Sequence, residues 1–206
     1  MITGVILAGG QSRRMGGGDK ALMDLAGRPM IAHIIARFAP QVAALALNAN
    51  GDARRFGALG LPVIGDTVAS FPGPLAGVLA GMRWTAEAHP EAGHVATCAA
   101  DTPLIPSDLV ARLAEGIDTA AAIALARSAG HRHPVIGLWP VALADDLEAA
   151  LRGGVRKVME WAARHGVADV AFPLDSSFEP PIDPFFNANT PDELAQLDAV
   201  LRAHPQ

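Results

Sequence analysis

Short apolar runs alternate with segments of helical periodicity along this 206-residue chain. The apolar runs predict strands at residues 4–7, 43–48, 62–64, 94–98, 120–126, 134–139 and 167–172, with a further short strand at 22–25. The amphipathic segments predict helices at residues 30–38, 75–88, 107–114, 141–151, 155–165 and 191–203. Near-continuous apolar strands separated by helices are typical of a sheet that is covered on both faces, so we expect an α/β fold.

Local signals define some boundaries of these elements. Thr190 suits the N-cap of the last helix, Pro191 suits its first position, and Glu193 completes a Thr-x-x-Glu capping box. Ser107 is placed to cap the helix predicted at 107–114. The segment 174–184 has little periodicity and predicts a loop.

Composition limits the class of protein. Half of the residues are hydrophobic and 18% are charged, so we expect one domain with a large core over residues 1–206. The one cysteine, Cys98, lies in an apolar run, which excludes an intrachain disulfide and suits a reducing compartment. We see no signal peptide and no apolar stretch near ~18 residues, so we expect a cytoplasmic protein without membrane association. A net charge of −5 argues against nucleic acid as a partner.

The strongest chemical indication comes from residues 7–20, which follow the first apolar run and read Leu-Ala-Gly-Gly-Gln-Ser-Arg-Arg-Met-Gly-Gly-Gly-Asp-Lys. A glycine-rich loop after a buried strand can direct backbone N–H groups at an anion, which Arg14 and Lys20 would help to neutralise. The pattern predicts a triphosphate site. It is not a Walker A loop, because Lys20 is not followed by Ser or Thr.

Polar residues follow the next apolar runs as well. Asn48 and Asn50 follow the second predicted strand, Asp66 the third and Asp101 the run that contains Cys98. Ligands of open α/β sheets bind outside the carboxyl ends of the strands, so we expect these residues to share one rim with the glycine loop. Asp101 is a candidate ligand for Mg²⁺, and Asp66 is a second candidate oxygen donor. The alternative for both is an Asp turn, in which the carboxylate bonds nearby backbone N–H groups.

Two further segments have both a structural and a functional interpretation. Gly77 and Gly81 share one helix face, which permits either a wall of the nucleotide pocket or close packing of the helix on the sheet. Asn187 and Asn189 precede the last helix, where their amides suit either phosphate or metal contacts or bonds that stabilise the loop.

The basic residues Arg156 and Lys157 precede a predicted helix, where the helix dipole disfavours positive charge. An anionic ligand would relieve that conflict, and a solvated basic surface is the alternative. His131 and His133 precede a predicted strand, and without a third ligand nearby they indicate a polar lip beside the substrate in preference to a zinc site.

Taken in order, residues 7–20, 73–77 (Gly-Pro-Leu-Ala-Gly), 101–103 (Asp-Thr-Pro) and 187–191 (Asn-Ala-Asn-Thr-Pro) resemble the molybdenum cofactor guanylyltransferases. The resemblance covers nearly the whole chain. It implies a three-layer Rossmann-like nucleotidyltransferase fold, with a mostly parallel sheet and at least one antiparallel strand. It also implies transfer of GMP from GTP to the terminal phosphate of the molybdenum cofactor (molybdopterin), with release of pyrophosphate.

The resemblance implies roles for matching residues of this chain. Contacts to GTP are implied for Leu7, Ala8, Gly9, Gly10, Lys20, Asn48, Asp66 and Asp101. Asp101 is also implied as the Mg²⁺ ligand, and Arg14 and Lys20 would stabilise charge on the reacting phosphates beside it. Contacts to the pterin are implied for Arg156, Lys157, Asn187 and Asn189.

Three alternatives stay open at this point. The first is a related cytidylyltransferase, whose loop looks like Leu-Ala-Ala-Gly. This chain has the pair Gly9-Gly10 in the loop, which favours guanine. A nucleotidyltransferase that acts on a sugar phosphate is a second alternative. A noncatalytic module that binds a nucleotide and delivers the cofactor is the third. Molybdoenzyme apoproteins or their chaperones are then further partners that the resemblance allows.

Overall fold

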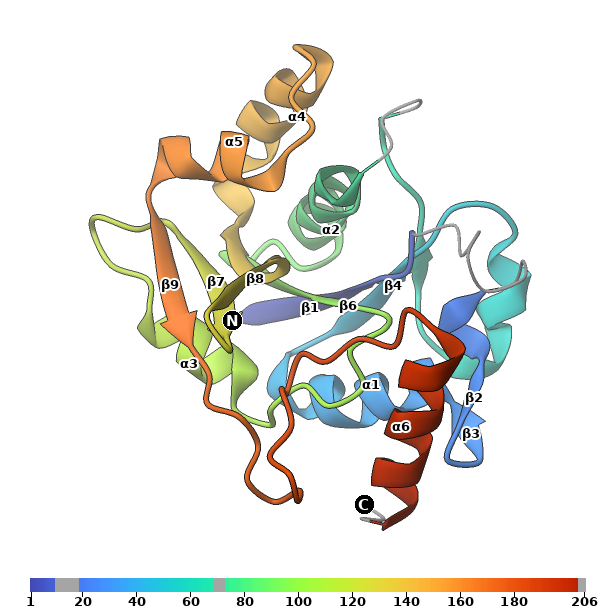
Figure 1. Ribbon diagram of the computed structural model, residues 1–206. Helices are drawn as coiled ribbons and strands as arrows, with labels where there is room; N and C mark the ends of the chain where they lie inside the picture. Colours follow the sequence, from blue (N-terminus) through green and yellow to red (C-terminus); the bar gives the residue numbers. More distant parts are fainter. Residues whose placement is uncertain (10–18, 69–72, 204–206) are drawn as a thin grey trace.

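The computed structural model describes residues 1–9, 19–68 and 73–203 (Figure 1). Its main sheet has the strand order β5-β4-β1-β6-β8-β7-β9. The strands are β1 (Ile2–Leu7), β4 (Leu45–Asn48), β5 (Val63–Ile64), β6 (His94–Ala99), β7 (Ile123–Ser128), β8 (His131–Pro140) and β9 (Val167–Ala171). Strand β8 is antiparallel to β6 and β7, whereas the other pairs are parallel. The expected mostly parallel sheet with an antiparallel strand is confirmed.

Helices cover both faces of this sheet (Figure 1). They are α1 (Met30–Phe38), α2 (Pro74–Ala88), α3 (Leu109–Glu115), α4 (Ala144–Arg152), α5 (Val158–Ala162) and α6 (Pro191–Ala203). Helices α1 and α3 form one core with the sheet, and α2, α4 and α5 form a second core on the opposite face. Because side chains alternate along a strand, Ile6 of β1 lies in the first core and Val5 in the second. No helix in the described ranges is long and apolar enough to cross a membrane.

The last helix packs away from the main sheet, against the small hairpin of β2 (Asp24–Leu25) and β3 (Arg28–Pro29). The backbone N–H of Ala26 in the hairpin turn donates to Asp198 of α6 over 2.7 Å. The predicted capping box is confirmed, because Glu193 N–H donates to Thr190 Oγ1 over 3.2 Å and Thr190 N–H donates to the Glu193 carboxylate over 2.9 Å. This anchoring fixes the segment before α6 beside the rim of the sheet.

Two strands differ from the prediction. Strand β7 begins at Ile123 and not at residue 120, because the Asp118 carboxylate accepts hydrogen bonds from the N–H groups of Ala120 and Ala121 and forms a turn there. Strand β8 begins at His131, after a turn in which Ala129 has a φ of 46° and the following glycine one of 80°. The expectation that residues 131–133 precede the strand was therefore wrong.

Several helical boundaries were also wrong. The helix predicted at 155–165 is the five-residue α5 followed by a 3-10 turn, and the one predicted at 141–151 opens with a 3-10 turn before α4. Asp108, and not Ser107, stands at the N-cap of α3, without a side-chain bond to the helix. The strand predicted at 22–25 is restricted to β2, because a 3-10 turn occupies Lys20–Leu22.

Candidate active site

The carboxyl ends of β1, β4, β5 and β6 lie along one edge of the sheet, because these strands are mutually parallel. Just beyond the strand ends, Ala8 N–H donates to the carbonyl of Asn48 over 2.8 Å, and Ala100 N–H donates to the carbonyl of Leu7 over 3.0 Å. The first residues of the glycine loop therefore lie between the ends of β4 and β6. The predicted common rim is confirmed for the part of the glycine loop that the structure describes.

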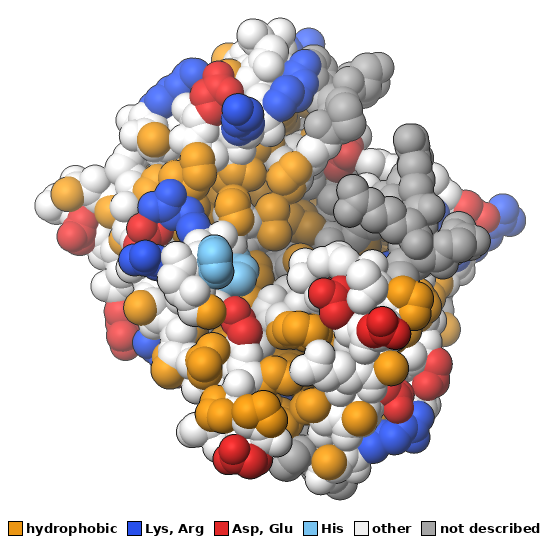
Figure 2. Space-filling model, in the orientation of Figure 1, with side chains coloured by type: hydrophobic (Ala, Val, Ile, Leu, Met, Phe, Trp, Pro, Cys, Tyr) orange, Lys and Arg blue, Asp and Glu red, His pale blue; other side chains and the backbone are white. Residues whose placement is uncertain are grey.

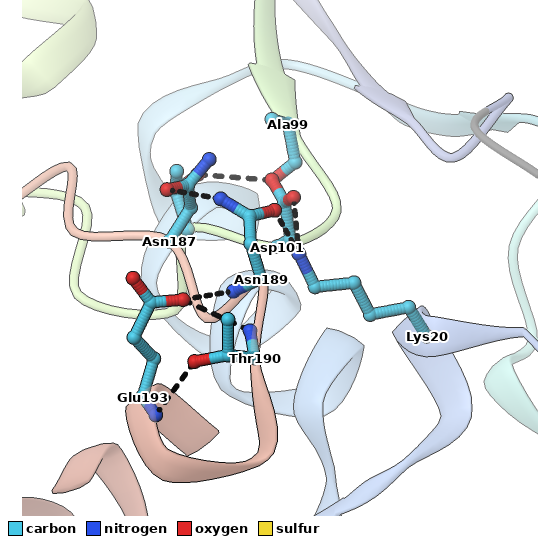
Figure 3. A network of polar contacts seen from close by, with 8 residues as sticks. Lys20, Ala99, Asp101, Asn187, Asn189, Thr190 and Glu193 are labelled. Carbon is cyan, nitrogen blue, oxygen red and sulfur yellow. Dashed lines mark hydrogen bonds and ion pairs between the residues drawn. The ribbon is translucent and has the colours of Figure 1, made fainter. Parts of the chain in front are cut away.

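A cation and a carboxylate meet at this rim. The Lys20 ammonium lies 2.7 Å from Oδ2 of Asp101 and donates to Oδ1 of Asn189 over 2.9 Å (Figure 3). The side chains of Lys20 and Asp101 are 14% and 27% exposed. The three residues come from the exit of the glycine loop, the end of β6 and the segment before α6. Partial burial strengthens this ion pair relative to one on an open surface.

The amide of Asn189 is held in one orientation. Its Nδ2 group donates to Oδ1 of Asn187 over 2.9 Å, and its backbone N–H donates to the carboxylate of Glu193 over 2.8 Å (Figure 3). The hydrogen bond from Asn189, with those from Thr190, holds the pKa of Glu193 below its usual value. Because Nδ2 is committed to Asn187, the amide oxygen of Asn189 points at Lys20.

A second group of polar side chains lies at the ends of β4 and β5. Nδ2 of Asn48 donates to Oδ1 of Asp66 over 3.0 Å, and Nδ2 of Asn50 donates to Oδ2 over 2.7 Å. The backbone N–H of Asp66 in turn donates to Oδ1 of Asn50 over 2.9 Å. Two strands, β4 and β1, lie between β5 and β6. At the usual spacing between neighbouring strands, the ends of β5 and β6 are therefore about 14 Å apart. That separation favours different roles for Asp66 and Asp101 over a shared metal ion.

Helix α2 approaches this group closely. A Cβ atom on Gly77 would lie 2.5 Å from Oδ1 of Asn48 and 2.9 Å from Cδ2 of Leu7. A Cβ atom on Gly81 would lie 3.0 Å from Cγ2 of Val5. Both glycines therefore allow the helix to pack closely on the sheet. At Gly77 the helix packs against the side chain of Asn48.

Arg55, which sequence analysis did not single out, joins the two polar groups. Its guanidinium donates to the carbonyl of Asn50 over 2.7 Å and to that of Asp52 over 3.0 Å, and it pairs with the carboxylate of Asp19. Asp19 immediately precedes Lys20. The residue before Arg55, Arg54, has a side chain that is 91% exposed and that pairs with Asp52. No sequence signal separated these adjacent arginines, because the difference lies in the directions of their side chains.

The basic residues Arg156 and Lys157 directly precede α5. The Arg156 guanidinium donates to the carbonyls of Leu151 and Val155 over 2.9 and 2.8 Å, and the Arg156 carbonyl lies 3.9 Å from the position of a Cβ on Gly73. Lys157 is exposed at the N-cap of α5. The contact of Arg156 and Lys157 with the pterin stays a prediction. Gly10 and Arg14 lie outside the described residues.

The donor set around Asp101 suits a magnesium ion that is shared with a substrate. The described residues contain no group of three or more His, Cys, Asp or Glu side chains that could hold a metal by themselves. Mg²⁺ does not need one, because it commonly takes one or two carboxylates together with phosphate oxygens and water. Cys98 is no competing nucleophile, since burial and the nearby Asp101 raise the pKa of its thiol well above the usual value.

Comparison with known proteins identifies the family of this chain. Residues 4–170 match the family model described as the MobA-like NTP transferase domain. The molybdenum cofactor guanylyltransferase of Bradyrhizobium sp. (strain ORS 278) is 52% identical to this chain over 205 residues, which are 97% of this chain and 92% of that protein. The enzyme of that name from Rhodopseudomonas palustris (strain BisB5) is 52% identical over 198 residues, with 95% and 92% covered. This chain belongs to the molybdenum cofactor guanylyltransferase family.

Solved structures place the family within the nucleotidyltransferase fold. The molybdopterin-guanine dinucleotide biosynthesis protein A of Archaeoglobus fulgidus has a TM-score of 0.74 and 25% identity, over 98% of this chain and 100% of that one. The 4-diphosphocytidyl-2C-methyl-D-erythritol synthase of Anaerococcus prevotii has a TM-score of 0.73 at 10% identity, over 98% and 96%, which shows the fold alone. The expected Rossmann-like nucleotidyltransferase architecture is confirmed, and members of the guanylyltransferase family are nucleotidyltransferases.

Proposed function

We propose that this protein transfers GMP from GTP to the terminal phosphate of molybdopterin, which yields the guanine dinucleotide form of the cofactor and pyrophosphate. The observation that carries the proposal is the 2.7 Å pair of Lys20 and Asp101, with Asn189 beside it, at the exit of the glycine loop. Relatives at 52% identity carry the name molybdenum cofactor guanylyltransferase, which favours guanine over cytosine and the pterin over a sugar phosphate.

The two polar groups of the rim suit the two ends of a nucleotide. Asn48 and Asp66 would receive the nucleoside, because hydrogen bonds from two amides hold the Asp66 carboxylate in one place. Leu7, Ala8, Gly9 and Gly10 would direct backbone N–H groups at the phosphates, with Arg14 and Lys20 supplying positive charge. The Asp101 end would then receive the phosphates that react.

Chemistry at this site requires positioning and charge neutralisation. An oxygen of the acceptor phosphate attacks the α-phosphorus of GTP, the bond from that phosphorus to the bridging oxygen breaks, and pyrophosphate leaves in line. Lys20 would stabilise the negative charge that develops on the phosphates. A phosphate monoester has a second pKa of about 6 and is largely ionised at pH 7, so no general base is required.

The proposed reaction is dependent on Mg²⁺. Asp101 would hold the ion, with the amide oxygens of Asn187 and Asn189 near it. Bound there, Mg²⁺ would neutralise charge on the triphosphate.

Residues 1–206 would form one catalytic domain. The buried free thiol of Cys98 suits a reducing compartment, and we place the protein in the cytoplasm. Its product would pass to molybdoenzyme apoproteins or to their chaperones.

The assignment is tested by incubating the purified protein with each of the four nucleoside triphosphates, with and without molybdopterin and with Mg²⁺ or a chelator, under anaerobic conditions. We expect pyrophosphate release with GTP, molybdopterin and Mg²⁺ together. Pyrophosphate release with CTP in place of GTP would assign the protein to cytidylyl transfer. Pyrophosphate release with a sugar phosphate in place of molybdopterin would show that the acceptor is a sugar phosphate. Binding of GTP without pyrophosphate release would support the delivery module.

A further inference from the structure

We propose that a hydrogen-bonded chain of Asp183, Ser128 and His133 recognises the ring of the pterin acceptor, at the edge where an amino group stands beside a ring N–H. The inference rests on the proposed function, gives a specific role to His133 of the expected polar lip, and adds Asp183 and Ser128 to the acceptor site. The chain of three residues lies outside every motif that pointed to the family.

The position of these residues at the catalytic rim follows from the sheet. Strand β7 ends at Ser128 on the same edge as β6 because both are antiparallel to β8. The pairing of β6 with β8 ends at Thr97 and Gly137, and β8 then shifts its register before His133 pairs with Ala126 of β7. The three residues therefore lie at the edge of the sheet where β6 ends and Asp101 follows.

The segment before α6 makes the same connection from the other direction. It carries Asp183 at one end and Asn187 and Asn189 at the other, and Asn189 binds Lys20. Figure 2 shows a hollow on this face of the molecule, floored by hydrophobic side chains, with histidine side chains beside it and Lys and Arg side chains above it. An acceptor with an anionic phosphate and a flat heterocycle matches a surface of this kind.

The hydrogen bonds among Asp183, Ser128 and His133 define which of their atoms are donors and which are acceptors. Oγ of Ser128, a residue only 3% exposed, donates to Oδ1 of Asp183 over 2.7 Å and lies 2.7 Å from Nε2 of His133. Because the hydroxyl hydrogen is used on the carboxylate, Nε2 of His133 must carry the hydrogen in the other bond. Nδ1 of the neutral ring is then an acceptor, and burial supports the neutral form by lowering the pKa of His133.

Asp183 retains accepting capacity. Oδ1 takes the bond from Ser128 and a second one, of 2.8 Å, from the N–H of Phe185. Within the described ranges, Oδ2 takes no hydrogen bond and the carboxylate forms no ion pair with Lys or Arg. A half-buried carboxylate oxygen binds N–H donors of a ligand well, and Oδ2 of Asp183 together with Nδ1 of His133 would provide one acceptor for each of two adjacent N–H groups.

An aromatic wall supports the same ligand. The His133 ring packs against Phe185 with 4.7 Å between centroids, and Phe185 packs edge-on against Phe172 at 5.2 Å. This packing fixes the plane of the His133 ring. The two acceptors that the ligand would use, Oδ2 of Asp183 and Nδ1 of His133, therefore belong to rigid groups, which lowers the entropic cost of binding a rigid heterocycle.

The competing explanation is that the chain only ties the segment before α6 to the sheet. The variant Asp183→Asn tests this, because the amide oxygen still accepts from Ser128 and Phe185 while the carboxylate charge is lost. Asp175→Asn is the matched control, since Asp175 lies in the same segment and its carboxylate bonds the N–H and hydroxyl of Ser177. Anaerobic titration of molybdopterin, followed by its fluorescence, gives the Kd, and calorimetry with Mg·GTP gives nucleotide affinity.

We expect Asp183→Asn to weaken molybdopterin binding and to raise the KM for the acceptor by about 10- to 100-fold, as for a lost bond to a charged group. The affinity for Mg·GTP and the melting temperature should stay close to those of the unmodified protein and of Asp175→Asn. An unchanged Kd for molybdopterin, or an equal loss in Asp175→Asn, would overturn the inference.

A second variant and a second readout protect the test. If Asp183→Asn fails to fold, Ser128→Ala is the second variant, because it frees Asp183 to move. We expect Ser128→Ala to weaken molybdopterin binding and to leave the affinity for Mg·GTP unchanged. An equal loss of both affinities would overturn the inference. If the unmodified protein binds molybdopterin but releases no pyrophosphate, the proposed function fails, and the Kd values of the variants still decide the inference.

Discussion

The side-chain oxygen of Asn48 occupies space that Gly77 leaves open, since a Cβ atom on Gly77 would lie 2.5 Å from it. We predict that Gly77→Ala displaces Asn48, and with it Asp66, at a cost of about 1–3 kcal/mol in stability from overpacking. GTP affinity, measured by calorimetry, should fall as well. Gly57→Ala is the control, because no heavy atom lies within 4 Å of its added Cβ. Unchanged GTP binding in Gly77→Ala would separate Asn48 from nucleotide recognition.

The pair of Lys20 and Asp101 should dominate the chemical step. We expect Lys20→Ala and Asp101→Ala each to cost about 2–4 kcal/mol of transition-state stabilisation, which is roughly 30- to 900-fold in kcat. Steady-state rates of pyrophosphate release measure this effect. Because the two side chains touch, the double variant should lose less than the product of the single losses.

Arg202→Ala controls for the loss of a surface ion pair, since Arg202 pairs with Asp198 on the exposed side of α6. It should retain normal turnover. Near-normal rates in both Lys20→Ala and Asp101→Ala would remove these residues from the mechanism.

Arg55 and Arg54 are adjacent and equally charged, and the structure predicts opposite results for their removal. Arg55→Ala should raise the KM for GTP by about tenfold, because it releases Asp19 and the carbonyl of Asn50 at once. Arg54→Ala should leave KM and kcat unchanged, because the Arg54 side chain is 91% exposed. Kinetics of both variants at saturating acceptor provide the comparison. Equal effects of the two changes would show that the contacts of Arg55 with Asp19 and Asn50 do not support GTP binding.

Stability should decrease in mild acid. Burial is the largest cause that lowers the pKa values of His33, His94 and His133 below the usual 6.5. The unfolded chain therefore binds more protons than the folded protein once the pH falls below about 6.5, so the stability present above that pH is lost progressively as the pH falls toward the folded values. Urea denaturation at pH 7.5 and pH 5.5 measures the difference. An equal or higher midpoint at pH 5.5 would show that these histidines do not control stability in this range.

Local pattern predicted those parts of the fold that depend on local interactions. Helix α1 and the capping box at Thr190 and Glu193 agree with the prediction because apolar spacing and capping act within a few residues. The boundaries failed where a side chain or a turn competed with the pattern. Asp118 delayed the start of β7, and the turn at Ala129 extended β8.

The candidate site was predictable where polar residues directly follow apolar runs. Asp101 and Asn48 were found in this way, and parallel strands made their common rim an inference from chain order alone. Asp183 could not be found by that rule, because it lies in an irregular segment whose position depends on the docking of α6. Two signals were available for its partners: Ser128 ends an apolar strand, and His133 belongs to the polar lip that is expected beside the substrate.

The sequence by itself determined a glycine loop after a buried strand, polar residues at the strand ends and the family to which they belong. Only the tertiary structure decided which of these groups meet, because contacts between Lys20 and Asp101, 81 residues apart, and between Lys20 and Asn189, 169 residues apart, depend on strand order and helix docking. Strand order and helix docking are set by the packing of whole elements on the two faces of the sheet, and no local periodicity encodes them.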